Sequence, residues 1–140
     1  MWFLDTGYLI ALFSDKDTFH PQAVALREKA LSHQQTLITT EAVLFEVGAA
    51  FSKVAHRTLG AELIRSLLND PTIEVVESSV QRRDKAITLF TDRPDKDWSL
   101  CDCLSFVVMR ERSVEAALTP DHHFTQAGFV ALMLEGERIH

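Results

Sequence analysis

Short apolar runs alternate with longer amphipathic segments along almost the entire chain, and this alternation restricts the fold more than any other feature. Strands are predicted at residues 2–4, 36–40, 73–76, 116–119 and 131–134. Segments with apolar residues at helical spacing lie between them, over about 20–32, 44–55, 59–68, 80–90 and 99–112. Strands that alternate with helices form a parallel sheet covered on both faces, so we expect an α/β fold with a short parallel sheet of about five strands.

The most regular helical pattern follows the second predicted strand, which ends in Thr39-Thr40. Apolar and small residues recur there every three or four positions and form one stripe: Leu44, Val47, Gly48, Phe51, Val54 and Ala55. A threonine hydroxyl can accept a hydrogen bond from the first amides of a helix, so both threonines are candidate helix caps. Pro21 suits a helix start, whereas Pro71 indicates a helix end.

The length and composition are those of one globular domain. A chain of 140 residues with 46% hydrophobic and 24% charged residues can bury a core, which excludes intrinsic disorder, a collagen and a coiled coil. The sequence shows no repeat of solenoid length. We therefore expect a single domain over residues 1–140.

Charge and cysteine content restrict the partners and the compartment. The net charge is −6 at pH 7, so bulk electrostatic attraction alone cannot hold a nucleic acid, and a phosphate ligand needs another source of positive charge. Cys101 and Cys103 are too close in sequence for an ordinary disulfide and lack zinc-site spacing, which favours a reducing cytoplasm. Residues 1–5 have no basic flank, so we expect neither a signal peptide nor membrane association.

Two acids are predicted at strand ends and two on helices. In an open parallel sheet the ligand crevice lies beyond the carboxyl ends of the strands, where the strand order reverses. Asp5 ends the first predicted strand and Asp121 follows the fourth, so both carboxylates face one crevice if these strands are neighbours. Glu46 lies among small alanines in the most amphipathic segment, and Asp102 lies in the first helical turn after Ser99.

Each acid also has a purely structural interpretation. Asp5 could cap a helix or form a turn, and Asp121 could belong to an ordinary turn. Asp102 could complete a capping box with Ser99. Glu46 could be a solvated helix residue, which is the usual environment of glutamate. Capping and metal binding do not exclude each other.

Other conspicuous residues favour packing or solvent exposure. The adjacent His122 and His123 could ligate a metal, but on a turn they are expected to point apart as a surface pair. The two cysteines are expected to pack as small apolar residues. Basic residues form short clusters that are typical of solvated faces: Arg82, Arg83 and Lys85, then Arg110 and Arg112. The sequence contains no glycine-rich nucleotide motif and no serine nucleophile elbow.

Four segments together resemble the acidic motifs of PIN-domain nucleases. They are Asp5 after the first strand, Glu46 in the helix after Thr39-Thr40, residues 97–102 (Asp-Trp-Ser-Leu-Cys-Asp) and residues 119–124 (Thr-Pro-Asp-His-His-Phe). The resemblance spans nearly the whole chain, and the small size is similar to that of the VapC-like toxins of toxin-antitoxin pairs.

This resemblance implies a Rossmann-like sheet and a metal-dependent endoribonuclease that cleaves single-stranded RNA and is held inactive by a cognate antitoxin protein. The implied metal-site residues are Asp5, Glu46, Asp102 and Asp121. The auxiliary candidates are Thr6, Asp97 and Ser99. A homodimer is the family expectation. Because no extended basic tract is present, RNA contacts would rest on scattered lysines and arginines.

The charge of these acids indicates the cofactor. Four converging carboxylates repel one another, which should raise at least one pKa, unless a hard cation such as Mg²⁺ or Mn²⁺ neutralises them. Such an ion would bind the scissile phosphate and lower the pKa of a water. Two alternatives stay open. One is a catalytically silent PIN-like module that only binds protein or RNA, and the other is a phosphohydrolase or receiver domain of a different class.

Overall fold

The computed structural model describes residues 1–134, which form a five-stranded parallel sheet in the order β3-β2-β1-β4-β5. The strands are β1 (Trp2–Leu4), β2 (Leu37–Thr40), β3 (Ile73–Val76), β4 (Ala116–Leu118) and β5 (Val130–Ala131). This sheet confirms the predicted α/β class and the parallel arrangement. Residues 135–140, which the predicted single domain includes, lie outside the described residues.

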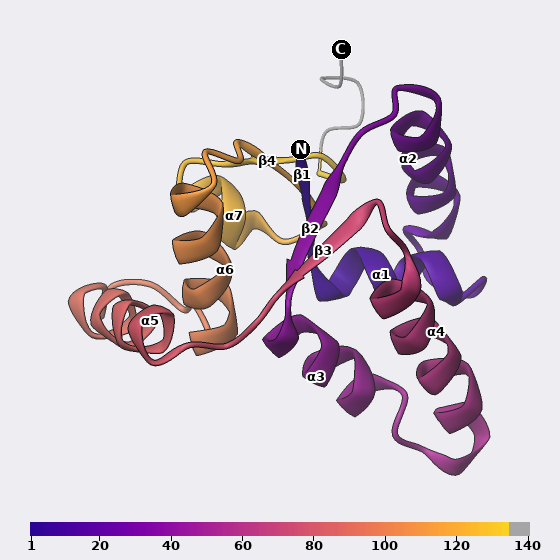
Figure 1. Ribbon diagram of the computed structural model, residues 1–140, viewed down its shortest axis with the longest axis horizontal. Helices are drawn as coiled ribbons and strands as arrows, with labels where there is room; N and C mark the ends of the chain where they lie inside the picture. The colour runs from indigo at the N-terminus through magenta and orange to yellow at the C-terminus, as the bar shows by residue number, and fades with distance from the viewer. Residues whose placement is uncertain (135–140) are drawn as a thin grey trace.

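Helices cover both faces of the sheet, as predicted. They are α1 (Thr6–Phe13), α2 (His20–Ser32), α3 (Glu41–Ala50), α4 (Arg57–Asn69), α5 (Val80–Asp92), α6 (Leu100–Glu111) and α7 (His122–Gln126), with a 3₁₀ turn at Val54–His56. Figure 1 shows α1, α2 and α4 on one side of the strands and α5, α6 and α7 on the other. Within the described residues, no helix has the length and apolar character needed to cross a membrane.

The strand order reverses beside β1, and this reversal determines which side chains meet. The chain steps from β1 to β2 to β3 in one direction and then crosses back to β4 and β5 on the other side of β1. Leu4 of β1 is paired with Leu118 of β4, so these strands end side by side. The residues that follow them therefore lie at the switch point of the sheet, where ligands bind in folds of this class.

An aromatic cluster fixes α6 against α7 near this edge. The Phe106 ring lies with its centroid 5.0 Å from Phe124, 5.1 Å from Trp98 and 5.6 Å from Phe129. The indole Nε1 of Trp98 donates a 3.0 Å hydrogen bond to the side chain of Gln126 in α7. The loop before α6 is thus anchored to the segment after β4, although the two are distant in sequence.

Two short helices were not predicted. The turn predicted after the first strand is wrong, because α1 begins directly at Thr6. The sequence of α1 is apolar on almost every side and so lacks the periodicity that indicates a helix. The segment after Asp121 was also interpreted as a turn, but it forms α7, which is only 5 residues long. Neither helix has the amphipathic stripe on which the prediction of helices depends.

The predicted stripe from Leu44 to Ala55 is wrong beyond Phe51. Helix α3 ends at Ala50, and Val54 lies in the 3₁₀ turn with 91% of its surface exposed. The chain turns here because Phe51 packs against α4 at Gly60, where an added Cβ would lie 2.6 Å from the Phe51 Cβ. The predicted cap is confirmed at Thr40, whose side chain accepts a hydrogen bond from Val43. It is wrong at Thr39, whose buried hydroxyl instead donates to the Leu4 carbonyl of β1.

The last strand is shorter and earlier than predicted. β5 comprises Val130–Ala131 rather than residues 131–134. Gly128, with φ of +95°, forms the turn before it, in a conformation that residues with a side chain rarely adopt. Leu132 and Met133 are buried beyond the strand and donate backbone hydrogen bonds to Ala117 and Thr119.

Candidate metal centre

A cavity of about 530 Å³ lies at the carboxyl ends of β1 and β4, and we call it the acid cavity. The four predicted acids all line it: Asp5, Glu46, Asp102 and Asp121. The three auxiliary candidates also line it: Thr6, Asp97 and Ser99. The structure therefore brings together every residue of the predicted site from four separate elements. That they bind a metal stays a prediction.

Asp5 is the most buried of the four acids, with 7% of its surface exposed. It precedes α1, but its side chain makes no capping hydrogen bond, which removes the capping explanation for this residue. Its Oδ2 accepts a 2.7 Å hydrogen bond from the Thr119 hydroxyl. The pKa of Asp5 is raised to about 7, chiefly by burial and in smaller part by the neighbouring Asp102 and Glu46, while the Thr119 hydrogen bond opposes the shift.

Asp102 both caps α6 and lines the acid cavity. Its Oδ2 accepts from the Ser99 amide at 3.1 Å, and the Ser99 hydroxyl accepts from the Asp102 amide at 2.9 Å, so the predicted capping box is confirmed. Burial raises the pKa of this carboxyl, and the nearby Asp121 also raises it. Repulsion between acids is thus present, as predicted, but burial is the larger cause for both Asp5 and Asp102.

Glu46 reaches the acid cavity from the middle of α3 and is exposed. The Thr6 hydroxyl donates a 2.5 Å hydrogen bond to its Oε1, which orients the carboxylate at the cavity wall. Ala49, one turn further along α3, also lines the cavity and leaves space beside the glutamate. Burial raises the pKa of the neighbouring Cys101 thiol, and the Glu46 carboxylate adds to this, so the thiol stays protonated.

Asp121 is the N-cap of α7, and its Oδ1 accepts a 2.9 Å hydrogen bond from the His123 amide. The Thr119 hydroxyl, which donates to Asp5, accepts a 3.0 Å hydrogen bond from the Asp121 amide. One buried side chain therefore holds the ends of β1 and β4 in register. The interpretation of Asp121 as a residue of an ordinary turn is wrong.

His123 is a site residue that the sequence did not reveal. Its Nδ1 lies 3.2 Å from Oδ2 of Asp102 and 3.2 Å from Oδ1 of Asp121, and the residue lines the acid cavity. The expectation that both histidines point apart on the surface is wrong, since their ring centroids are 4.6 Å apart. The short helix α7 turns the His123 ring toward the carboxylates, and that helix was not predicted.

Glycine at position 7 permits the close approach of the two strand ends. A Cβ added at Gly7 would lie 2.9 Å from Cδ of Pro120, closer than real Cβ contacts. The first turn of α1 and the loop after β4 therefore touch through a position without a side chain. This contact brings Asp5 and Asp121 to one cavity.

The donor set of the acid cavity fits a hard divalent cation. Within residues 1–134, the cavity is lined by four carboxylates of the predicted site and by Asp97, but by no lysine or arginine. Oxygen donors of this kind suit Mg²⁺ and Mn²⁺. Basic residues of the predicted solvated clusters form ion pairs elsewhere, as Arg82 does with Glu111 at 3.0 Å and Arg112 with Glu74.

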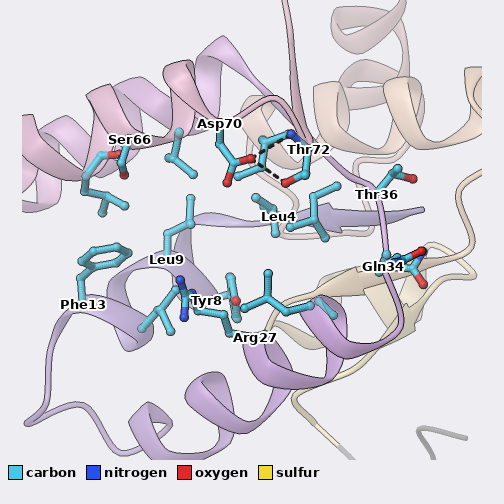
Figure 2. A pocket seen from close by; sticks show the side chains of 18 residues that line it. Leu4, Tyr8, Leu9, Phe13, Arg27, Gln34, Thr36, Ser66, Asp70 and Thr72 are labelled. Atoms are coloured by element: carbon cyan, nitrogen blue, oxygen red, sulfur yellow. Dashed lines mark hydrogen bonds between the residues drawn. The ribbon is translucent and has the colours of Figure 1, made fainter.

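A second cavity of about 510 Å³ lies between α1, α2 and α4, and its wall is mostly apolar (Figure 2). Asp70, which lines it, accepts hydrogen bonds from the amide and the hydroxyl of Thr72 at 2.8 and 2.6 Å. Burial raises the pKa of Tyr8 in this cavity to about 12, although Arg27 opposes the shift. Of these two cavities, only the acid cavity is lined by a cluster of carboxylates.

Comparison with known proteins agrees with the fold. The sequence model described as "PIN domain" matches residues 2–130. The chain belongs to the PIN-domain family. This confirms the resemblance seen in the sequence, and PIN-domain nucleases are typically metal-dependent ribonucleases.

Curated relatives of this PIN domain are toxins of Mycobacterium tuberculosis. The 23S rRNA-specific endonuclease VapC20, from strains CDC 1551 and H37Rv, is 27% identical over 136 residues, or 96% of this chain and 100% of the relative. The crystal structure of VapC20, described as a sarcin-ricin loop cleaving toxin, superposes with a TM-score of 0.82 at 21% identity. The superposition covers 93% of this chain and 97% of VapC20 and shows that the fold is shared.

Proposed function

We propose that this PIN-domain protein is a metal-dependent endoribonuclease that cleaves single-stranded RNA and acts as the toxin of a toxin-antitoxin pair. The observation that carries the proposal is the convergence of Asp5, Glu46, Asp102 and Asp121 on one cavity at the switch point of the sheet. Full-length similarity to an rRNA endonuclease supports it.

In this proposal the four carboxylates hold Mg²⁺ or Mn²⁺. When bound, the ion supplies the positive charge that the acidic chain lacks: it neutralises the scissile phosphate and lowers the pKa of a water molecule. Asp5 is the strongest candidate for a direct ligand. It is buried, it does not cap α1, and its raised pKa shows that the folded protein disfavours its charge without a cation.

Neighbouring side chains orient the carboxylates. Thr119 donates to Oδ2 of Asp5 and so fixes the direction of this carboxylate. Thr6 directs Glu46 toward the cavity through the hydrogen bond to Oε1. Ser99 fixes Asp102 through the capping box. Well-oriented ligands of this kind reduce the rearrangement that metal binding requires.

The relative and the charge of the chain support the proposed substrate class. VapC20 is named for specificity toward 23S rRNA, and an rRNA hairpin is therefore the first structured substrate to test. The chain has a net charge of −6, so the bound cation and scattered lysines and arginines would supply the contacts to RNA phosphates.

The proposal includes an antitoxin partner that covers the acid cavity. An arginine of the partner fits there because its planar guanidinium can donate two hydrogen bonds to one carboxylate. Co-purification of the toxin with the product of the adjacent gene should suppress cleavage, and full activity of a saturated complex would contradict this part. A homodimer in the cytoplasm completes the proposal, and its mass in solution tests the dimer.

The deciding experiment is cleavage of labelled RNA by purified protein. Wild type and the control Asp15→Asn, which alters an exposed acid outside the cavity, should cleave in Mg²⁺ or Mn²⁺ and stop in excess chelator. Asp5→Asn should not cleave under any of these conditions. Cleavage that persists in chelator would contradict the metal mechanism, whereas a failure of wild type to cut any RNA would favour a catalytically silent binding module.

A further inference from the structure

Two histidines add nitrogen donors to one edge of the acid cavity. Nδ1 of His123 lies 3.2 Å from Oδ2 of Asp102 and 3.2 Å from Oδ1 of Asp121. Nδ1 of His122 lies 3.8 Å from the same oxygen of Asp121. One donor atom from each of Asp121, His122 and His123 lies within 4.8 Å of the others. The exposed His122 is not part of the proposed Mg²⁺ site.

The donor atoms of Asp121, His122 and His123 approach the spacing of a coordination sphere. Zn²⁺ binds histidine and carboxylate at about 2.0–2.1 Å, so tetrahedral donors lie about 3.3 Å apart. The 3.2 Å contact between His123 and Asp121 is close to this value, and the 3.8 Å contact of His122 is longer. His122 has 67% of its side chain exposed, so rotation of its ring can close that gap.

The donor chemistry selects a different class of ion from that of the four carboxylates. Mg²⁺ strongly prefers oxygen, whereas imidazole nitrogen suits Zn²⁺, Co²⁺, Ni²⁺ and related ions. Two histidines with the Asp121 carboxylate form a mixed set that partly neutralises such an ion and stabilises it through the nitrogens. Asp5 and Glu46, on the same cavity wall, add negative potential that favours any cation there.

We infer that Asp121, His122 and His123 form a second binding site for a transition-metal ion of the Zn²⁺ or Co²⁺ class, at the α7 edge of the acid cavity, with Asp102 as the carboxylate that orients His123. Binding of this ion by the isolated protein does not depend on nuclease activity. One consequence does rest on the proposed function: because Asp121 belongs to both sites, the ion competes with Mg²⁺.

Cobalt spectroscopy on the full-length, untagged protein tests the site without RNA. Titration with Co²⁺ should produce visible absorption bands of a four-coordinate ion that saturate at one equivalent, and Zn²⁺ should displace the signal. No thiolate-to-cobalt charge-transfer band should appear, because the proposed donors are nitrogen and oxygen. A strong thiolate band would place the ion at Cys101 or Cys103 and overturn the assignment.

Three single substitutions identify the donors. His122→Ala and His123→Ala should each weaken Zn²⁺ binding by at least the ~10–100-fold typical of losing a supporting residue of a metal site. His56→Ala, which removes an exposed histidine outside the cavity, should leave the affinity unchanged. His122 is exposed, so its variant should have the wild-type unfolding midpoint in chelator, which excludes misfolding. Equal affinity in wild type and His122→Ala would overturn the site of Asp121, His122 and His123.

Discussion

The Thr119 hydroxyl links two acids that come from opposite ends of the chain. It donates a 2.7 Å hydrogen bond to Oδ2 of Asp5 and accepts a 3.0 Å hydrogen bond from the amide of Asp121. Thr119 itself is fully buried at the end of β4. One fully buried hydroxyl therefore helps to set the relative position of the two acids.

Removal of this hydroxyl should destabilise the protein, and a serine at this position should restore the lost stability. Thr119→Val removes the donor to Asp5 and leaves the Asp121 amide unpaired, so the free energy of unfolding should fall by ~1–3 kcal/mol. The pKa of Asp5 should rise further, because the Thr119 hydrogen bond lowers it in wild type. Urea unfolding and an NMR titration of Asp5 measure these effects. Thr119→Ser keeps the hydroxyl, and an equal rise of the Asp5 pKa in both variants would contradict this role.

Metal-free stability should fall as the pH rises from about 4 to about 7. The pKa of Asp5 is about 7 in the folded protein and about 4 in the unfolded chain, so the folded state binds more protons in this interval. Asp5→Asn removes the buried charge and should raise the free energy of unfolding at pH 8 in chelator by up to about 4 kcal/mol. Thermal unfolding from pH 4 to pH 8 provides the measurement.

Addition of Mn²⁺ should make wild type more stable than Asp5→Asn, which is the reverse of their order of stability in chelator. A bound ion stabilises the folded state by mass action, so wild type should gain stability that Asp5→Asn does not. Asp15→Asn, an exposed acid outside the cavity, should follow wild type throughout. The same Mn²⁺-induced rise in wild type and Asp5→Asn would show that Asp5 is not a ligand.

Two substitutions at Asp102 should separate its role in the capping box from its role in cleavage. Ser99 is the N-cap of α6, and Asp102 accepts a hydrogen bond from its amide. An asparagine oxygen can accept the same hydrogen bond, so Asp102→Asn should keep most of the stability and lose cleavage. Asp102→Ala also loses the capping box and should unfold ~0.5–2 kcal/mol more easily. Chemical unfolding and RNA cleavage of both variants in Mg²⁺ distinguish the roles. Wild-type cleavage by Asp102→Asn would leave the residue with a structural role alone.

Gly7→Ala should affect the site more than the helix. The new Cβ would press on Pro120 at 2.9 Å and displace the loop that carries Asp121, so the stabilisation by Mn²⁺ should decrease. Gly48→Ala is the matched control, because its Cβ would meet Ile64 at an ordinary 3.7 Å. That control should gain up to ~1 kcal/mol from helix propensity and keep its response to Mn²⁺. Equal responses in both variants would show that the Gly7 contact does not position the site.

The sheet and the two strand-end acids could be predicted from the sequence because both follow from local pattern. Buried parallel strands are short apolar runs, and acids directly after them must lie at the carboxyl edge. Asp5 and Asp121 were predicted to meet only if their strands are neighbours, and the pairing of β1 with β4 confirms this condition. Glu46 and Asp102 also reach the cavity, but their helix packing follows from the whole core rather than from local pattern.

The features that the sequence did not reveal depend on contacts between distant segments. Helix α7 forms where the Asp121 side chain caps it and Phe124 packs into the aromatic cluster. His123 could not be placed without that helix, since its ring direction follows from the helical turn. Likewise, α3 stops where Phe51 meets Gly60, which lies in another helix. Periodicity within one segment cannot report such contacts.

Helix capping gives the four acids unequal freedom of movement. Carboxylate oxygens of Asp102 and Asp121 accept hydrogen bonds from backbone amides at the start of a helix, so the rotamers of both residues become fixed when α6 and α7 fold. Conformational entropy is therefore lost during folding rather than at the arrival of a cation. Glu46 caps no helix, and the Thr6 hydroxyl, a side-chain donor, orients its carboxylate, so its longer side chain can change rotamer without movement of the backbone. A cation that enters the cavity would therefore meet two carboxylates with fixed rotamers and one that can adjust its position.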